Sequence, residues 1–134
     1  MTITQVTVAS SPAELMELFA QLAAVGDVDA LLALYEADAV LQPEFGVVFR
    51  GHEQIRPALT ELLAMKPQIT YTSAADVVIC GNMALVSNFW TMQATAPDGT
   101  KVTDGGTSAD VVRRQTDGSW LVLIDQPRGI PTPA

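Results

Sequence analysis

The sequence has little of what several classes of protein require. In 134 residues it has one cysteine, Cys80, and one histidine, His52. An internal disulfide is therefore excluded, and a zinc site built from thiolates and imidazoles is not expected. Basic residues are also few, seven against fifteen acidic ones, which leaves a net charge of −8. Without the basic stripe that displaces counterions from a phosphate backbone, the chain is not expected to bind nucleic acid.

Long apolar runs and targeting segments are missing as well. No apolar stretch approaches the roughly 18 residues that a membrane-spanning helix needs. The first residues lack the basic and apolar regions of a signal peptide, and a lone cysteine fits a reducing compartment. Glycine-rich phosphate loops and nucleophile elbows do not occur. We therefore expect a cytoplasmic protein that has no membrane partner and that uses neither a metal nor a cofactor.

Apolar residues, in contrast, are plentiful and make up 49% of the sequence. That fraction is enough for a hydrophobic core, and a chain of this length forms one domain by the usual relation between size and burial. We expect a single domain over residues 1–134, with irregular ends at residues 1–10 and 127–134.

The first half of the chain carries helix signals. The run Ser11–Glu14 is typical of a capping box with proline at the first helical position, and apolar residues follow it at helical spacing. Gly26 ends this helix. Asp27 predicts the cap of a second helix, whose apolar stripe extends to Tyr35.

A third helix is predicted after Gly51, with Leu59 among its inward-facing residues. Pro57 is expected to delay or kink its start, because proline lacks the N–H that a helix interior uses. Two short extended segments, residues 39–42 and 47–49, precede this helix.

The second half changes to strand signals. Gly81-Asn82, Asp98-Gly99 and Asp117-Gly118 each predict a two-residue hairpin turn, and the segments around them are rich in Val, Ile, Thr and Trp. Four consecutive strands follow, and those of about fifteen residues are long enough that they must bend. Gly105-Gly106 predicts a bulge or bend. The fold class is α+β: three N-terminal helices packed on a strongly curved antiparallel sheet, a cone-shaped half-barrel that encloses a cavity.

Two-residue turns fix the register of the strands, so the residues that face each other can be counted. The count places Asp110 opposite both Asp125 and Ser87, and Ser87 opposite Asp76. One face of the sheet, called here the acid face, then carries all four. The apolar residues of the acid face would form a cavity wall: Phe89, Val112 and Leu123.

Neighbouring carboxylates on one sheet face repel each other. If Asp110 and Asp125 are partly buried, they hold one proton between them, and one pKa is raised. Such a pair can act as acid and base near neutral pH. The alternative is that both carboxylates lie on an exposed face and are simply solvated.

The opposite face is also apolar and carries Trp90 and Trp120 among valines and isoleucines. Hydrophobicity alone would turn this tryptophan face toward the helices. Two apolar faces must both be covered, one of them by a second subunit.

Five short runs carry a resemblance to a known superfamily: Gly26–Ala30, Leu34–Ala39, Gly51–Ile55, Arg113–Trp120 and Asp125–Pro127. With them the chain resembles the nuclear-transport-factor-two-like superfamily and, within it, an uncharacterised branch of the SnoaL-like and ketosteroid-isomerase-like group. The resemblance covers nearly the whole chain. It implies the cone fold, with the acid face toward the cavity and the tryptophan face outside, where such proteins form homodimers. Function does not follow from it, because this fold hosts many chemistries.

Comparison with the ketosteroid isomerases implies a role for one residue, whereas two other catalytic groups of those enzymes have no counterpart in this sequence. Asp110, followed by Val-Val-Arg, matches the strand aspartate that helps to hold the dienolate oxygen. Phe19 stands where the family has a tyrosine donor. Pro43 stands where it has the proton-shuttling aspartate, with Glu44 beside it. Steroid isomerisation is therefore not expected.

The chain is also similar to the limonene-type epoxide hydrolases, which use two aspartates on neighbouring strands. Asp110 and Asp125 match those aspartates. Ser108 stands where that family has a bridging arginine, although Arg114 shares the predicted face with Asp110.

Two hypotheses result. The first is an isomerase or hydrolase that acts without a cofactor on a small, largely apolar molecule, with Asp110 and Asp125 as catalytic acid and base. The second is a non-catalytic protein of the same fold that binds a small molecule or dimerises. The expected ligand-binding residues are Phe19, Tyr35, Leu59, Ser87, Phe89, Val112 and Leu123.

Overall fold

The structure, a computed structural model, describes residues 8–71 and 76–130. The predicted irregular ends lie partly outside these residues. In chain order the elements are α1 (Pro12–Val25), α2 (Val28–Leu32), β1 (Tyr35–Glu44), β2 (Val47–Arg50), α3 (Gly51–Ala64), β3 (Gln68–Tyr71), β4 (Asp76–Cys80), β5 (Met83–Thr95), β6 (Lys101–Arg114) and β7 (Trp120–Asp125).

The capping residues of the first two helices are as predicted. The Ser11 side chain accepts a hydrogen bond from the N–H of Glu14 (3.1 Å), and Pro12 is the first residue of α1. Gly26 ends α1 in the left-handed conformation, φ 84°, which glycine adopts at little cost. The Asp27 side chain then accepts from the N–H of Ala30 (3.0 Å) and caps α2.

The second helix is shorter than predicted, and the assignment of Tyr35 to it is wrong. Helix α2 ends at Leu32, and Tyr35 is the first residue of β1. The N–H of Val122 in β7 donates to the carbonyl of Leu34 (2.8 Å), and Tyr35 pairs with Val122. Pairing with a strand about ninety residues away thus overrides the helical spacing of the apolar residues.

Pro57 does not delay the third helix. Helix α3 begins at Gly51 and continues through Pro57 to Ala64. The helix therefore tolerates the missing N–H in its interior.

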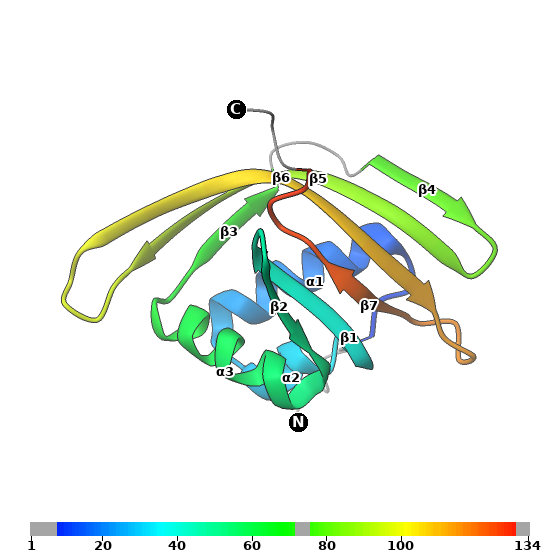
Figure 1. The fold of residues 1–134 in the computed structure, drawn as a ribbon, viewed down its shortest axis with the longest axis horizontal. Coiled ribbons are helices and arrows are strands. Elements are labelled where there is room, and N and C mark those ends of the chain that lie inside the picture. Colours follow the sequence, from blue (N-terminus) through cyan, green and yellow to red (C-terminus); the bar gives the residue numbers. More distant parts are fainter. Residues whose placement is uncertain (1–7, 72–75, 131–134) are drawn as a thin grey trace, which may run out of the picture.

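Within the described residues, seven strands form one sheet in the order β2-β1-β7-β6-β5-β3, and β4 also pairs with β5. The predicted meander is confirmed for β4 to β7, whereas β3 was not predicted. The sheet is mixed rather than antiparallel, because β1 and β7 run parallel. Hairpin turn motifs predict pairing only between strands that are consecutive in the sequence, so they could not predict the pairing of β1 with β7. Figure 1 shows the three helices gathered on the same side of the long β5–β6 hairpin.

The predicted bulge at Gly105-Gly106 is wrong. Gly105 pairs with Thr91 and Gly106 with Trp90, in a register that continues unbroken along β5 and β6. The two glycines instead allow β6 to lie close to Trp90 of β5. A Cβ atom on Gly105 would lie 2.9 Å from the carbonyl oxygen of Trp90, and one on Gly106 would lie 3.5 Å from its indole Nε1.

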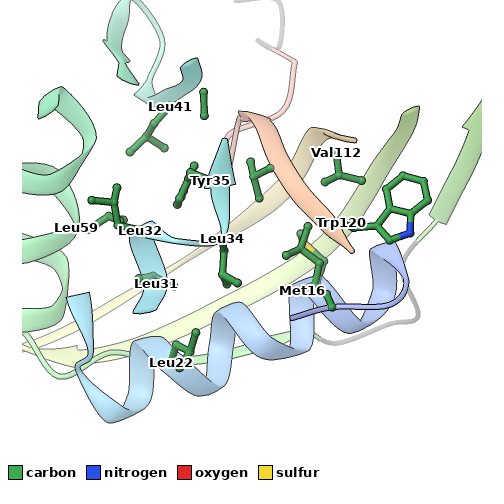
Figure 2. Packing of buried hydrophobic residues seen from close by; sticks show 14 of the residues in the cluster. Met16, Leu22, Leu31, Leu32, Leu34, Tyr35, Leu41, Leu59, Val112 and Trp120 are labelled. Atoms are coloured by element: carbon green, nitrogen blue, oxygen red, sulfur yellow. The ribbon is translucent and has the colours of Figure 1, made fainter. Parts of the chain in front are cut away.

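The hydrophobic core lies between the helices and the sheet. Leu15, Leu31 and Ile55 come from the three helices and are fully buried. Figure 2 shows side chains of α1, β1 and α3 meeting in this cluster. Among the residues that the structure describes, no helix combines the length and apolar composition that crossing a membrane requires.

Candidate active site

The β5–β6 register differs from the prediction by one residue. The N–H of Ala96 donates to the carbonyl of Thr100 (2.8 Å), so the loop contains three residues rather than Asp98-Gly99 alone. Asp110 consequently faces Val86 instead of Ser87.

The shift reverses the two faces of β5. Ser87 and Phe89 lie on the outer face, and Phe89 is 57% exposed. Neither lines the pocket described below, so their predicted place beside Asp110 is wrong. Asn88 and Trp90 take the inner positions instead.

The predicted pairing of Asp110 with Asp125 is confirmed, but two deviations cancel to produce it. The β6–β7 loop also has three residues, because the N–H of Gln115 donates to the carbonyl of Ser119 (2.7 Å). The register then shifts back between Val112 and Val111, which leaves Leu123 as an extra residue in β7. The two aspartates therefore lie close enough for each to shift the pKa of the other.

The bulge in β7 and the register shift of β5 together overturn the predicted outer tryptophan face. Trp120 and Val122 are buried in the core rather than placed outside. Trp90 is half-buried and lines the pocket. Both tryptophans are thus on the side of the acid pair, and Leu123 does not line the pocket.

The two carboxyl groups are held by donors from three elements. The hydroxyl of Tyr35 in β1 donates to Oδ2 of Asp125. The backbone N–H of Gln126, directly after β7, donates to Oδ1 of Asp110 (2.8 Å). Ser108 of β6 also contacts Asp110. Asp110 is 5% exposed, so these bonds operate away from bulk water.

Burial and mutual repulsion control the protonation of the pair. Burial and the charge of Asp125 raise the pKa of Asp110 well above its ordinary value. Burial also raises the pKa of Asp125, but hydrogen bonds from Tyr35 and Asp110 oppose this increase. The two carboxyl groups are therefore coupled, and holding one proton between them avoids placing two negative charges side by side.

Two tyrosines surround the pair in protonated form. Burial and the neighbouring carboxyl groups raise the pKa of Tyr35 and of Tyr71 above the ordinary tyrosine value. Tyr35 also stacks edge-on against Phe19, with ring centroids 6.2 Å apart. The Nε2–H of His52 donates to the backbone carbonyl of Tyr35 (2.8 Å), since a carbonyl can only accept. The Phe19 ring and the His52 side chain thus hold the ring and the backbone of Tyr35, which positions its hydroxyl group.

The pair opens into a pocket of about 700 Å³ between the sheet and helices α1 and α3. Five of the predicted site residues line it: Phe19, Tyr35, Leu59, Asp110 and Asp125. Val112 is fully buried and does not. Figure 2 shows Tyr35 and Leu59 within the adjoining core. The remaining wall is mostly apolar and includes Met16, Leu41, Phe49, Leu62, Met65, Ile69, Met92 and Val122.

Sequence reasoning missed a charged cluster in this wall. Both Nη atoms of Arg128 donate to the carboxylate of Asp104 (2.8 and 2.6 Å), and Nη2 also reaches Glu44 (3.2 Å). The guanidinium lies 5.5 Å from the ring centroid of Trp90. Residues 127–130 do lack helix and strand, as predicted, but the ion pairs of Arg128 fix this segment to the sheet. An irregular segment carries no periodic signal from which this cluster could be predicted.

The pocket wall carries more negative than positive groups. Among the described residues that line it, Arg128 is the only lysine or arginine, against Glu44, Glu61, Asp104 and the acid pair. Arg114 is exposed and does not line the pocket. Pro43, the position predicted to match the shuttling aspartate of ketosteroid isomerases, and its neighbour Glu44 do line the pocket, but Glu44 contacts Arg128.

Metal coordination has no obvious candidate. Within residues 8–71 and 76–130, no group of three or more His, Cys, Asp or Glu side chains is placed to hold a metal ion. The polar groups that line the pocket include the two carboxyls of the acid pair and two tyrosines, Tyr35 and Tyr71, a set suited to moving protons.

Comparison with known proteins gives a family and a fold. The model of the SnoaL-like domain matches residues 15–122. No curated protein matches the sequence significantly. A Xanthomonas campestris structure named as a calcium/calmodulin-dependent protein kinase II association domain has a TM-score of 0.78 at 22% identity, over 97% of this chain and 99% of that one.

Two further structures have a TM-score of 0.77. A nuclear transport factor 2-like superfamily protein from Salmonella enterica is 15% identical over 91% of this chain and 90% of its own. A Novosphingobium aromaticivorans protein named as an aromatic ring hydroxylase is 25% identical over 89% and 86%. The predicted resemblance to the SnoaL-like group of the nuclear-transport-factor-two-like superfamily is confirmed.

Proposed function

This chain belongs to the SnoaL-like domain family, and we propose that it is an enzyme that moves protons on a small molecule without a cofactor, as an isomerase or hydrolase. One observation carries the proposal: Asp110 is buried, Asp125 lies half-buried beside it and accepts the hydrogen bond from Tyr35, and both line an apolar pocket. A mostly apolar pocket with a few convergent polar groups and shifted pKa values is the usual form of an active site. In this proposal the pocket is the cone-shaped cavity of the family.

The two carboxyl groups would have different roles. The Asp125 carboxylate is the base that removes a proton from the substrate or from a water molecule. The protonated Asp110 is the acid that gives its proton to the developing oxygen anion. Tyr35 stabilises the Asp125 carboxylate by its hydrogen bond before Asp125 takes up the proton. The contact between the two aspartates then allows the proton to return to Asp110, which restores the starting state.

The charge of the pocket supports a neutral or cationic substrate. Arg128 is already paired with Asp104 and Glu44, so it offers little to an anionic ligand. An anion would also meet the charge of the acid pair without water to screen it. A small, largely apolar molecule with one oxygen function fits both the wall and the pair.

NMR titration of the side-chain carboxyl groups tests the proposal directly. We expect Asp110 and Asp125 to titrate together, in two steps that both lie above the ordinary aspartate pKa of about 4, because burial and sharing of one proton disfavour the second charge. Asp98, which is exposed in the β5–β6 loop, is an unburied comparison whose pKa is lowered by hydrogen bonds from Thr100. Independent titration of Asp110 and Asp125 near the ordinary aspartate pKa of about 4 would contradict the proposal.

A non-catalytic binding or assembly protein is the second candidate. The observation that favours it is that Phe19 and Pro43 stand where ketosteroid isomerases have two catalytic groups. The similar structure from Xanthomonas campestris is also named for association rather than for a reaction. A tight complex with an unreacted ligand, unaffected by Asp110→Asn and Asp125→Asn, would select this candidate.

We also propose that a second copy of the chain covers the outer face of the sheet. Val78 of β4 and Leu85 and Phe89 of β5 are exposed on that face, at 59%, 48% and 57%. Light scattering after size exclusion should give the mass of two chains, and Leu85→Glu should shift it toward one because it places a charge within the apolar patch. A monomer in the wild-type protein at high micromolar concentration would contradict this.

A further inference from the structure

The segment that follows β7 lies directly against the Asp110 end of the pocket. We call residues 126–129 the strap. At its start, the N–H of Gln126 donates to Oδ1 of Asp110 (2.8 Å), and the carbonyl of Gln126 accepts from the N–H of Ala109 (2.9 Å). Pro127 and Arg128, the next two residues, line the pocket. The strap therefore joins the pocket wall to the acid pair.

Arg128 anchors the strap to two separate strands. Its guanidinium binds Asp104 of β6 through two nitrogens and Glu44 at the end of β1 through one. Only 24% of its side chain is exposed, so these bonds are less weakened by solvent than those of a surface ion pair. None of its hydrogen bonds or ion pairs reaches Asp110 or Asp125. Any influence of Arg128 on the pair must pass through the strap.

The other end of the strap fits closely against β6 and β5. Indole Nε1 of Trp90 donates to the carbonyl of Pro127 (2.9 Å). Gly129 has a φ of 66°, and a Cβ atom on it would lie 2.5 Å from the carbonyl oxygen of Thr107. The side-chain amide of Gln126 also donates to the carbonyl of Gly129 (2.7 Å). These contacts define one conformation of the strap.

We infer that Arg128 is a positioning residue that, through the strap, holds the N–H of Gln126 at Oδ1 of Asp110 and so leaves Oδ2 to carry the proton shared with Asp125. A neutral carboxyl group accepts hydrogen bonds best at its carbonyl oxygen. An N–H fixed at Oδ1 therefore favours the O–H on the other oxygen. The inference rests on the proposed role of the acid pair, whose other titratable neighbours are Tyr35 of β1 and Tyr71 of β3.

Hydrogen exchange of the Gln126 amide in the full chain tests this inference. Arg128→Gln should accelerate that exchange roughly tenfold or more, because the strap then opens locally without global unfolding. Because the Gln126 N–H donates to Asp110, its amide shift should follow the titration of Asp110 in the wild-type protein, and this dependence should shrink in the variant. Arg128→Lys keeps the charge but loses the forked geometry, so its exchange should be intermediate.

A second variant perturbs the strap without changing any charge. Gly129→Ala introduces a side chain where φ is positive and Thr107 is too close, and it should accelerate exchange at Gln126 as Arg128→Gln does. Arg113→Gln is the matched control. Arg113 binds Glu36 through two nitrogens, a similar ion pair that does not line the pocket, and exchange at Gln126 should be unchanged in this variant.

The outcomes separate this inference from the proposed function. If exchange at Gln126 is the same in Arg128→Gln, Gly129→Ala and the wild-type protein, the β6–β7 ladder alone holds the strap and the inference is wrong. Raised pKa values of Asp110 and Asp125 in the wild-type protein would still support the proposed function in that case. Ordinary pKa values for both aspartates would contradict the proposed function, whether or not exchange at Gln126 changes in the variants.

Discussion

Replacing Asp125 with asparagine is expected to lower kcat/KM by roughly 10²- to 10⁴-fold, the range that a positioned acid or base contributes. Asparagine has nearly the same shape and can still accept the hydrogen bond that Tyr35 donates. The pocket should therefore keep its form while the base is lost. The measurement is turnover of a panel of small neutral epoxides and β,γ-unsaturated ketones, which sample hydrolysis and isomerisation.

Asp110→Asn should cause a loss of similar size for a different reason, because it removes the proton donor. The pH profile distinguishes the two roles. With the pair intact, kcat/KM should rise and fall with pH as the pair gains its first charge and then its second. In Asp110→Asn only one carboxyl group remains, so the fall at high pH should disappear from the residual activity.

Asp76→Asn is the control for both variants. Asp76 is an aspartate of the same sheet, exposed on β4 and outside the pocket wall, so its replacement should leave turnover unchanged. Full activity of Asp110→Asn and Asp125→Asn on a compound that the wild-type protein converts would rule out the acid–base role.

Local signals predicted those parts of the fold that local chemistry determines. The side-chain caps Ser11 and Asp27 and the stop at Gly26 depend on residues within one helical turn, and all three are found as expected. The Gly81-Asn82 turn is also right, and Asp76 does pair with Ser87. In each case the deciding contact lies within a few residues of the signal.

Loop length is where the prediction of the site failed. Asp-Gly occurs both in two-residue hairpin turns and in three-residue loops that place glycine in the left-handed conformation. Gly99 and Gly118 both adopt that conformation, with φ values of 88° and 87°. One extra loop residue exchanged the faces of β5 and so misplaced Ser87 and Phe89.

The acid pair survived this error only because of the bulge at Leu123. That bulge restores the count along β7, and no residue near Leu123 signals it. Trp120 and the acid pair could therefore share a side of the sheet, which strict alternation forbids. Parallel pairing of β1 with β7 is likewise long-range, so the Tyr35–Asp125 contact could not be derived from the sequence either.

The acid pair is expected to make the protein less stable as the pH rises above about 5. The buried proton that the proposed reaction uses would thus lower the free energy of unfolding at higher pH. Both aspartates have a pKa in the folded chain that is raised above the ordinary value of 3.8. Above that value the unfolded chain releases its protons while the folded chain retains them. The free energy of unfolding must then fall with pH, with a slope of at most about 1.4 kcal/mol per pH unit for each retained proton.

Other carboxyl groups act in a lower pH window. Hydrogen bonds from Arg113 lower the pKa of Glu36 below 4.5, and hydrogen bonds from Arg128 lower that of Asp104 below 3.8. Their stabilisation is complete above the ordinary values and is lost only as the pH falls through the lowered ones. From about pH 5 upward, the slope therefore belongs to Asp110 and Asp125 among the carboxyl groups with shifted pKa.

Urea unfolding of the wild-type protein and of the double variant Asp110→Asn/Asp125→Asn, from about pH 5 to about pH 8, measures this slope. The wild-type free energy of unfolding should decline across that range, and that of the double variant should lose this decline and exceed the wild-type value at the upper end. Asp76→Asn should follow the wild-type curve. If the wild-type curve and the double-variant curve decline in parallel, the pair is not protonated in the folded protein, and the shared proton on which both the stability argument and the proposed catalysis depend does not exist.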